Sequence, residues 1–172
     1  MGTEPTTTDD VDVDELIAGL VALGSDLPFN RHMGVTVVEV TPGHTVTRLA
    51  ANADLANHLG GVHAIATLAP AELAGALAAS SRLAPLVVRG YVPVAGGLSA
   101  RYRAPAVGAL TATADVPEDA LASCLADADA GQRPRVTAPI TVTDAAGLVV
   151  AEVELHIVYI DAADADARRQ AD

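Results

Sequence analysis

One Ala- and Leu-rich segment, residues 62–83, most constrains the fold of this chain. It is the only long apolar segment with helical character, and shorter segments of alternating polarity lie on both sides of it. Strands joined by hairpin-like turns form a mainly antiparallel sheet, which must cover an apolar face. We therefore expect an α+β fold in which a curved, mainly antiparallel sheet wraps around one long central helix.

The segments around this helix carry start and stop signals. Asp12 and Glu15 form a capping pattern ahead of a helix over residues 12–23, which Gly24 is expected to end. Residues 28–34 (PFNRHMG) are expected to be a connecting loop, and residues 117–128 a short helix. Strands are expected at residues 35–40, 44–49, 87–94, 98–103, 110–116, 135–143 and 148–160.

Pro70 lies inside the long apolar segment and leaves two interpretations open. In a helix interior, proline removes a hydrogen bond and crowds the preceding turn, which can kink the helix. In the first turn of a helix, proline is well tolerated, and the helix would then begin late. The sequence does not decide between a kink near Pro70 and a late start.

Composition bounds the domain count and the classes of partner. The 172 residues suit one domain, at residues 12–160, with disordered segments at 1–11 and 161–172. Asp and Glu number 22 against 10 Arg and no Lys, for a net charge of -12. This balance argues against nucleic-acid binding and against anionic membranes. Because no signal-peptide pattern and no uninterrupted apolar span are present, we expect a cytoplasmic protein with no membrane partner.

Cysteine and histidine usage gives no sign of redox or metal chemistry. Cys124 is the only cysteine, so it has no partner for an internal disulfide. His58 and His63 share a Gly-rich loop, but no third residue completes a metal-ligand spacing. We expect no metal and no cofactor.

The strongest candidate for a functional site is residues 57–64 (NHLGGVHA), followed by Glu72. Asn57 supplies an amide, and Gly60 and Gly61 allow a close approach to the backbone. Glu72 lies inside an apolar segment, where a carboxylate is costly to bury unless it is paired or neutralised. An acid beside a Gly-rich loop that offers backbone N–H groups is what a carbonyl-attacking site needs.

Each of these residues also has a purely structural interpretation. Glu72 can be a carboxylate stabilised near a helix N-terminus, and Asn57 can cap a turn. His63 is expected to shape the loop through a side-chain hydrogen bond. Arg101 and Arg103 share a strand face, where they can be solvated or can bind phosphate groups.

The order of elements and the motif N-x-x-G-x-x-H-A, with an acid nine residues after the His, resemble the hotdog-fold acyl-CoA thioesterases, especially the phenylacetyl-CoA type. A second segment, residues 102–110 (YRAPAVGAL), is similar to that family's aromatic-x-x-Pro-Ala-x-x-Gly stretch, with the Gly one residue early. The resemblance covers roughly residues 28–160. The short helix at 117–128 looks more like a poorly characterised bacterial sister branch.

The resemblance implies a homodimer or a dimer of dimers with the site between subunits, acting on acyl-CoA or an acyl-carrier thioester. Glu72 would be the base or nucleophile, the Ala64 N–H the oxyanion donor, and Asn57 the residue that orients water or the thioester carbonyl. We also expect His63 to belong to the catalytic residues. The residues expected to bind substrate are Gly60, Gly61, His58, Arg101 and Arg103.

Two other functions stay open. A non-catalytic hotdog protein that binds an acyl or aromatic ligand is favoured by Ala64, where the family often has Gly, and by Pro70 and the extra helix. A hydroxyacyl-thioester dehydratase is suggested by His58 and Glu72. Their spacing of fourteen resembles that of the His–Glu pair in hotdog dehydratases, although the prolines that follow the His in those enzymes are absent here.

Overall fold

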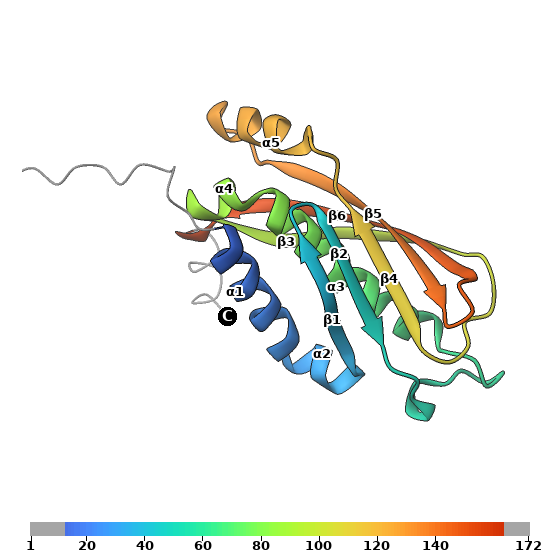
Figure 1. Cartoon of the computed structure of the whole chain (residues 1–172). Coiled ribbons are helices and arrows are strands. Elements are labelled where there is room, and N and C mark those ends of the chain that lie inside the picture. The colour runs from blue at the N-terminus through green and yellow to red at the C-terminus, as the bar shows by residue number, and fades with distance from the viewer. Residues whose placement is uncertain (1–12, 164–172) are drawn as a thin grey trace, which may run out of the picture.

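The computed structural model describes residues 13–163, whose helices lie against a six-stranded sheet (Figure 1). The expected Asp12 cap and the segments 1–11 and 164–172 lie outside the described residues. The elements are α1 (Val13–Asp26), α2 (Pro28–Met33), β1 (Val35–Thr41), β2 (His44–Leu49), a 3-10 turn (Ala53–Leu55), α3 (Ala64–Arg82), α4 (Ala84–Val88), β3 (Tyr91–Tyr102), β4 (Leu110–Asp115), α5 (Ala120–Asp129), β5 (Arg135–Asp144) and β6 (Val149–Asp161).

The sheet has the strand order β1-β2-β4-β5-β6-β3, and every neighbouring pair is antiparallel. Helix α3 runs along one face of the sheet, while α1 and α2 lie beside β1 at one edge (Figure 1). Strand β3 forms the other edge. The expected curved antiparallel sheet around one long helix is confirmed.

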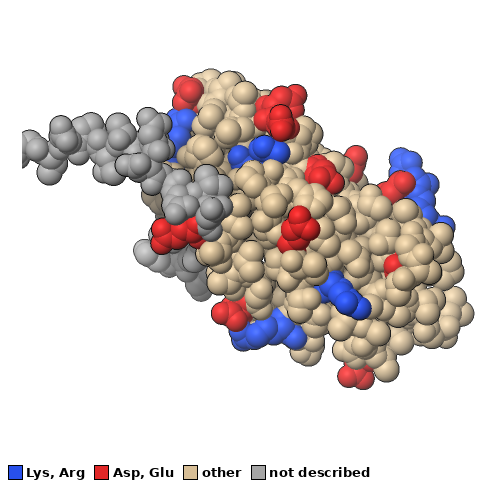
Figure 2. All heavy atoms as spheres, in the orientation of Figure 1, with Lys and Arg blue, Asp and Glu red and all other residues tan. Residues whose placement is uncertain are grey.

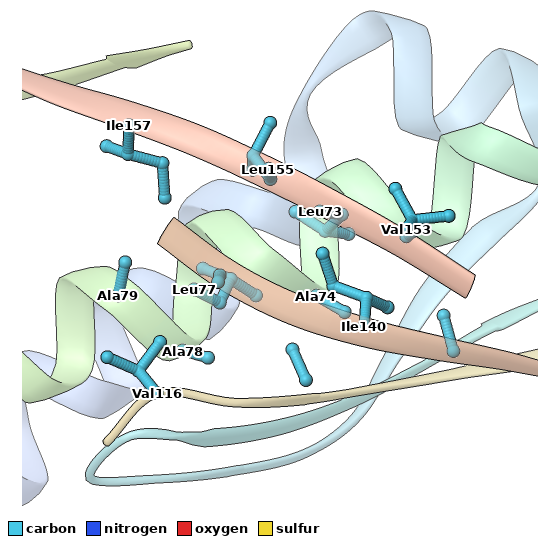
Figure 3. Packing of buried hydrophobic residues seen from close by; sticks show 14 of the residues in the cluster. Leu73, Ala74, Leu77, Ala78, Ala79, Val116, Ile140, Val153, Leu155 and Ile157 are labelled. Carbon is cyan, nitrogen blue, oxygen red and sulfur yellow. The ribbon is translucent and has the colours of Figure 1, made fainter. Parts of the chain in front are cut away.

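Small side chains let α3 lie close to the sheet. A Cβ added at Gly75 would lie 3.0 Å from Ile140 Cδ1 and 3.1 Å from Leu155 Cδ2, so these side chains already touch the helix backbone. Figure 3 shows Leu73, Ala74, Leu77, Ala78 and Ala79 of α3 packed against Val116, Ile140, Val153, Leu155 and Ile157. Along β6 the buried residues alternate with exposed Glu152, Glu154 and His156, as the period of two predicts.

Two expectations near the N-terminus are wrong. Helix α1 does not end at Gly24 but continues to Asp26. Gly24 lies where α1 packs closely on α3, since a Cβ there would lie 3.2 Å from Leu73 Cδ1. The expected loop at residues 28–34 is the helix α2. Pro28 begins it with a compatible φ, and Gly34 ends it in the left-handed conformation with φ 76.

The expected strand at residues 87–94 is wrong in its first half. Residues Ala84–Val88 form α4, with Pro85 in its first turn, and the strand begins only at Tyr91. From there β3 is continuous to Tyr102, with a bulge between Ala95 and Gly97, where two separate strands were expected. The short helix expected at 117–128 is present as α5, beginning at Ala120.

Pro70 neither ends α3 nor begins it. The helix starts at Ala64 and passes through Pro70 to Arg82, so a late start is excluded. The Thr47 hydroxyl donates a hydrogen bond of 2.7 Å to the Pro70 carbonyl oxygen, which ties α3 to β2. Over the described residues, α3 is long and apolar enough to cross a membrane, but 72% of that stretch is buried in the fold, as in a core helix.

Charged side chains are scattered over the face drawn in Figure 2, with wide uncharged areas between them. No large basic patch is visible on this face, in keeping with the excess of acidic residues. Within residues 13–163, no group of three or more His, Cys, Asp or Glu side chains is placed to hold a metal ion.

Candidate active site

Asn57 closes the loop that leads into α3. Its backbone N–H donates to the Gly61 carbonyl at 2.7 Å, and its Nδ2 donates to the Val62 carbonyl at 3.1 Å. Its Oδ1 accepts from the N–H groups of Leu59, at 2.8 Å, and Gly61, at 3.2 Å. The Asn57 amide therefore holds its own loop, which is the structural interpretation of this residue.

The two glycines of the loop are required for different structural reasons. Gly60 has φ 80, the left-handed conformation that glycine adopts without strain. Gly61 allows close contact with the segment between β3 and β4: a Cβ there would lie 2.8 Å from the Ala106 carbonyl oxygen. That same oxygen accepts a 2.8 Å hydrogen bond from the Val62 N–H. The two sequence segments that carry the family resemblance thus lie against each other.

His63 is the N-cap of α3. Its Nδ1 accepts a hydrogen bond of 3.2 Å from the Ile65 N–H, so this nitrogen carries no proton in the capped state. Its carbonyl accepts from the Thr67 N–H at 3.0 Å and from the Thr67 hydroxyl at 3.2 Å. Its own N–H donates to the Leu55 carbonyl at 2.8 Å. His63 shapes the turn into α3 through these bonds.

Ala64 has the one backbone N–H between residues 61 and 65 that makes no hydrogen bond within the described part of the chain. Every other N–H and carbonyl of that stretch is paired, with partners in Asn57, Leu55, Thr67, His63 and the segment after β3. Ala64 is exposed and lies in the first turn of α3, where N–H groups lack partners in the helix and the helix dipole favours negative charge. This donor is available to an oxyanion.

Tyr102, at the end of β3, was not identified as a site residue from the sequence. Its hydroxyl donates a hydrogen bond of 2.8 Å to the Ala64 carbonyl oxygen. Burial raises the pKa of this phenol, which keeps it protonated as a donor. Tyr102 belongs to the second segment of the family resemblance, but no pattern within one segment of the sequence reveals a contact between two segments.

Glu72 lies on the same face of α3 as Ala64 and Leu68, about two turns further along. The side chain is half-buried, and burial raises the pKa of its carboxyl group above the ordinary value of 4.5. No hydrogen bond or ion pair joins it to another residue of the described chain. A carboxylate that is desolvated and unpaired on a surface otherwise made of Ile65, Leu68 and Ala76 has the properties of a general base.

The other expected site residues lie apart from this constellation. His58 is exposed on the loop and makes no contact with Glu72 within the chain. Arg103 is ion-paired with Glu152, with Nε at 3.0 Å from the carboxylate. Arg101 lies opposite Glu152 in the β3–β6 register, in a surface hollow of about 630 Å³ that Glu154 also lines. These carboxylates make the two arginines a poor phosphate site within one chain.

A six-stranded antiparallel sheet wrapped around one long helix, entered through a Gly-rich turn, is the hotdog fold. A Pseudomonas aeruginosa protein of unknown function, PA5026, described as a probable thioesterase, shares it with 22% identity and a TM-score of 0.68, over 92% of this chain and 98% of that one. The E. coli PaaI protein from the phenylacetic acid degradation operon is 19% identical, with a TM-score of 0.66 over 86% of this chain and 94% of that one.

The thioesterase HI1161 from Haemophilus influenzae is also similar, at 18% identity and a TM-score of 0.66, over 85% of this chain and 91% of that one. At these identities the likeness establishes the fold. None of the curated protein sequences matches this chain. The chain belongs to the family "Domain of unknown function (DUF4442)", whose model matches residues 18–159.

Proposed function

We propose that this protein is a thioesterase that hydrolyses acyl-CoA or acyl-carrier thioesters in a site formed by two copies of the chain. The observation that carries the proposal is the exposed, free N–H of Ala64 at the start of α3, on the same helix as the unpaired, desolvated Glu72. A donor for a developing oxyanion and a carboxylate base are the two groups that attack on a thioester carbonyl requires.

The position of these groups on α3 favours a site shared between two copies. Ala64 and Glu72 are separated by about 12 Å along the helix axis, from a rise of 1.5 Å per residue. A carbonyl under attack must lie about 3 Å from both its oxyanion donor and the attacking group. Side chains tilt toward the helix N-terminus, so the gap between the two groups is shorter than this axial separation. We propose that Glu72 of one copy works with Ala64 of the other, as the family resemblance implies.

Strand β3 is the surface through which we propose that the two copies pair. It is a 12-residue strand at the edge of the sheet, with its outer row of backbone groups unpaired in the single chain. Val94 and Leu98 on it are 37% and 38% exposed. A long edge strand with apolar side chains is a template for pairing with another chain. We propose a homodimer, alone or as half of a tetramer.

In the proposed reaction the Glu72 carboxylate removes a proton from a water molecule as the water oxygen attacks the thioester carbonyl carbon. The carbonyl oxygen becomes negative and is stabilised by the Ala64 N–H of the partner copy. The C–S bond then breaks, the thiolate leaves, and the proton on Glu72 passes to the sulfur. A raised pKa suits Glu72 to both steps, because a base must also return its proton.

The neighbours named as thioesterases support the class of reaction, and the residues of α3 support the kind of acyl group. Ile65 is 67% exposed beside half-buried Leu68, and both share the face of α3 that carries Glu72. An uncharged, apolar or aromatic acyl group would cover these side chains. A cytoplasmic location stays the expectation drawn from the sequence.

One observation favours the alternative of a non-catalytic binding protein. The Asn57 side chain makes three hydrogen bonds within its own loop, which support a structural role instead of the water-orienting role that the family resemblance implies. The dehydratase alternative is less favoured because the prolines that follow the His in hotdog dehydratases are absent after His58.

Thiol release from a panel of short, long and aromatic acyl-CoAs tests the proposal, with wild type, Glu72→Gln and the matched control Glu39→Gln. Glu39 is an exposed carboxylate on β1, so its variant removes the same charge away from α3. We expect Glu72→Gln to lower kcat by about 10²-fold or more, the size of a general-base contribution, and Glu39→Gln to retain wild-type turnover.

Each other result has a defined meaning. Binding of acyl-CoA without turnover by the wild type would establish the binding protein instead. Full activity in Glu72→Gln would remove this residue from the mechanism. Formation of an enoyl thioester from a 3-hydroxyacyl-CoA, abolished in His58→Ala, would establish the dehydratase.

A further inference from the structure

We infer that Tyr102 is a positioning residue, which holds the first turn of α3 so that the Ala64 N–H points at the substrate carbonyl. This inference rests on the proposed thioesterase function. Tyr102 reaches α3 from the end of β3, and its hydroxyl donates to the Ala64 carbonyl at 2.8 Å. Among residues 13–163, it is the one side-chain hydrogen bond from the sheet to a backbone group of residues 61–65.

The peptide group between Ala64 and Ile65 is held at both of its ends. Its carbonyl oxygen accepts from the Tyr102 hydroxyl, and its N–H donates to His63 Nδ1 at 3.2 Å. A planar peptide group fixed at both ends cannot rotate freely. The preceding peptide group, which carries the Ala64 N–H, has its carbonyl on His63 fixed by two bonds from Thr67.

The segment that follows Tyr102 supports the same turn from its other side. The Ala106 carbonyl accepts from the Val62 N–H at 2.8 Å and leaves no space for a side chain at Gly61. The connection between β3 and β4 therefore contacts the turn both before and after His63. The two sequence segments that carry the hotdog resemblance, residues 57–64 and 102–110, therefore form one unit around the Ala64 N–H.

This support matters because a helix N-terminus is otherwise a poor place for a fixed donor. The first turn of a helix lacks part of its hydrogen bonds and frays. An oxyanion donor contributes most when its direction is set before the reaction begins. Tyr102 is 48% exposed and lies outside the buried core, so its hydroxyl bond supports the turn more than its ring supports the core.

The test compares Tyr102→Phe with Tyr91→Phe, which removes a phenol hydroxyl from the opposite end of β3, where it has no hydrogen bond within the described residues. We expect Tyr102→Phe to lower kcat by about three- to tenfold, the range that loss of one neutral hydrogen bond supports. We expect KM to stay at the wild-type value and the melting temperature to fall by about 2–4 °C, as the loss of one hydrogen bond implies. Tyr91→Phe should leave kcat and KM unchanged.

Amide hydrogen exchange provides a readout that does not depend on activity. In Tyr102→Phe the N–H groups of Ile65 and Thr67 should exchange about three- to tenfold faster than in wild type, while those of the middle of α3 keep their rates. Wild-type exchange at both positions, or wild-type kcat, would overturn the inference, and a change in KM alone would make Tyr102 a substrate contact. A wild-type protein with no thioesterase activity would refute the proposed function. In that case the amide exchange rates of Ile65 and Thr67 would still test whether Tyr102 holds the first turn of α3.

Discussion

At the scale of single residues, Glu72 occupies an environment that stability alone would not select. It is half-buried, it has no partner within the described chain, and it shares its face of α3 with apolar side chains. Nearby, the Thr67 hydroxyl, the Asn57 amide and His63 Nδ1 all make hydrogen bonds. A half-buried carboxylate without a partner lowers the stability of the folded protein. Such destabilising residues are typical of functional sites.

Glu72→Gln should stabilise the folded protein at neutral pH. Burial raises the pKa of Glu72 above its unfolded value near 4.5, so the folded chain holds this proton more tightly than the unfolded chain. The stability from the neutral form is full below pH 4.5 and is lost as the pH rises through the folded-state pKa. A glutamine does not ionise and avoids that loss.

Melting temperatures of wild type and Glu72→Gln, measured from pH 4 to pH 8, check this expectation. The advantage of the variant should grow as the pH rises and vanish at the acid end. Glu39→Gln again serves as the control for removing one negative charge and should show no such trend. A variant that is less stable than wild type at pH 8 would contradict the desolvation of Glu72.

At the scale of elements, β2 and α3 are joined by a hydrogen bond at the proline. The Thr47 hydroxyl donates to the Pro70 carbonyl at 2.7 Å, and Thr47 is fully buried. Thr45, two residues earlier on the same buried face of β2, is also fully buried, but its hydroxyl has no partner. The strand therefore presents two buried threonines that differ in hydrogen bonding.

Replacing each threonine by valine should change stability in opposite directions. Thr47→Val leaves the Pro70 carbonyl without this donor and should lower the free energy of unfolding by about 1–2 kcal/mol. Thr45→Val removes an unpaired buried hydroxyl and should raise it by up to about 1 kcal/mol. Denaturant unfolding of the two variants beside wild type measures both. Equal losses would mean that both hydroxyls make native hydrogen bonds.

At the scale of the whole molecule, the two edges of the sheet differ. The β1 edge contacts α1 and α2, whereas no strand of residues 13–163 lies on the outer side of β3 (Figure 1). A protein that left so long an apolar edge uncovered would be prone to aggregate. Pairing of two β3 strands would cover it and bring two α3 helices into one particle.

Lysine at Val94 and Leu98 together should convert the proposed homodimer to a monomer, because two charges on each β3 repel across the paired edges. Light scattering coupled to size exclusion measures the mass, and thiol release should fall with it, since each site needs both copies. Val38→Lys, at a 61% exposed position on β1, should leave mass and activity unchanged. A monomeric wild type, or an active monomeric variant, would contradict the shared site.

The sequence by itself determined the architecture, because architecture follows from periodicity. The alternation in β6, the hairpin of β1 and β2, and the single long apolar helix were each visible in local patterns, and the sheet that they imply is present. The candidate site could be located to one turn and one acid for the same reason. Glycines beside a capping His, followed by an acid in an apolar helix, are a local pattern.

Only the tertiary structure decided how residues far apart in the sequence meet. From the sequence, Gly24 was predicted to end a helix, but in the structure it lies where α1 contacts α3. Residues 87–90 were predicted to be strand, but α4 extends to Val88 and β3 begins at Tyr91. The hydrogen bond from Tyr102 to Ala64, and the three hydrogen bonds of the Asn57 amide within its loop, likewise depend on the tertiary structure. A local sequence pattern predicts whether a side chain faces the core or solvent. Which distant residue that side chain contacts depends on how the helices and strands pack together.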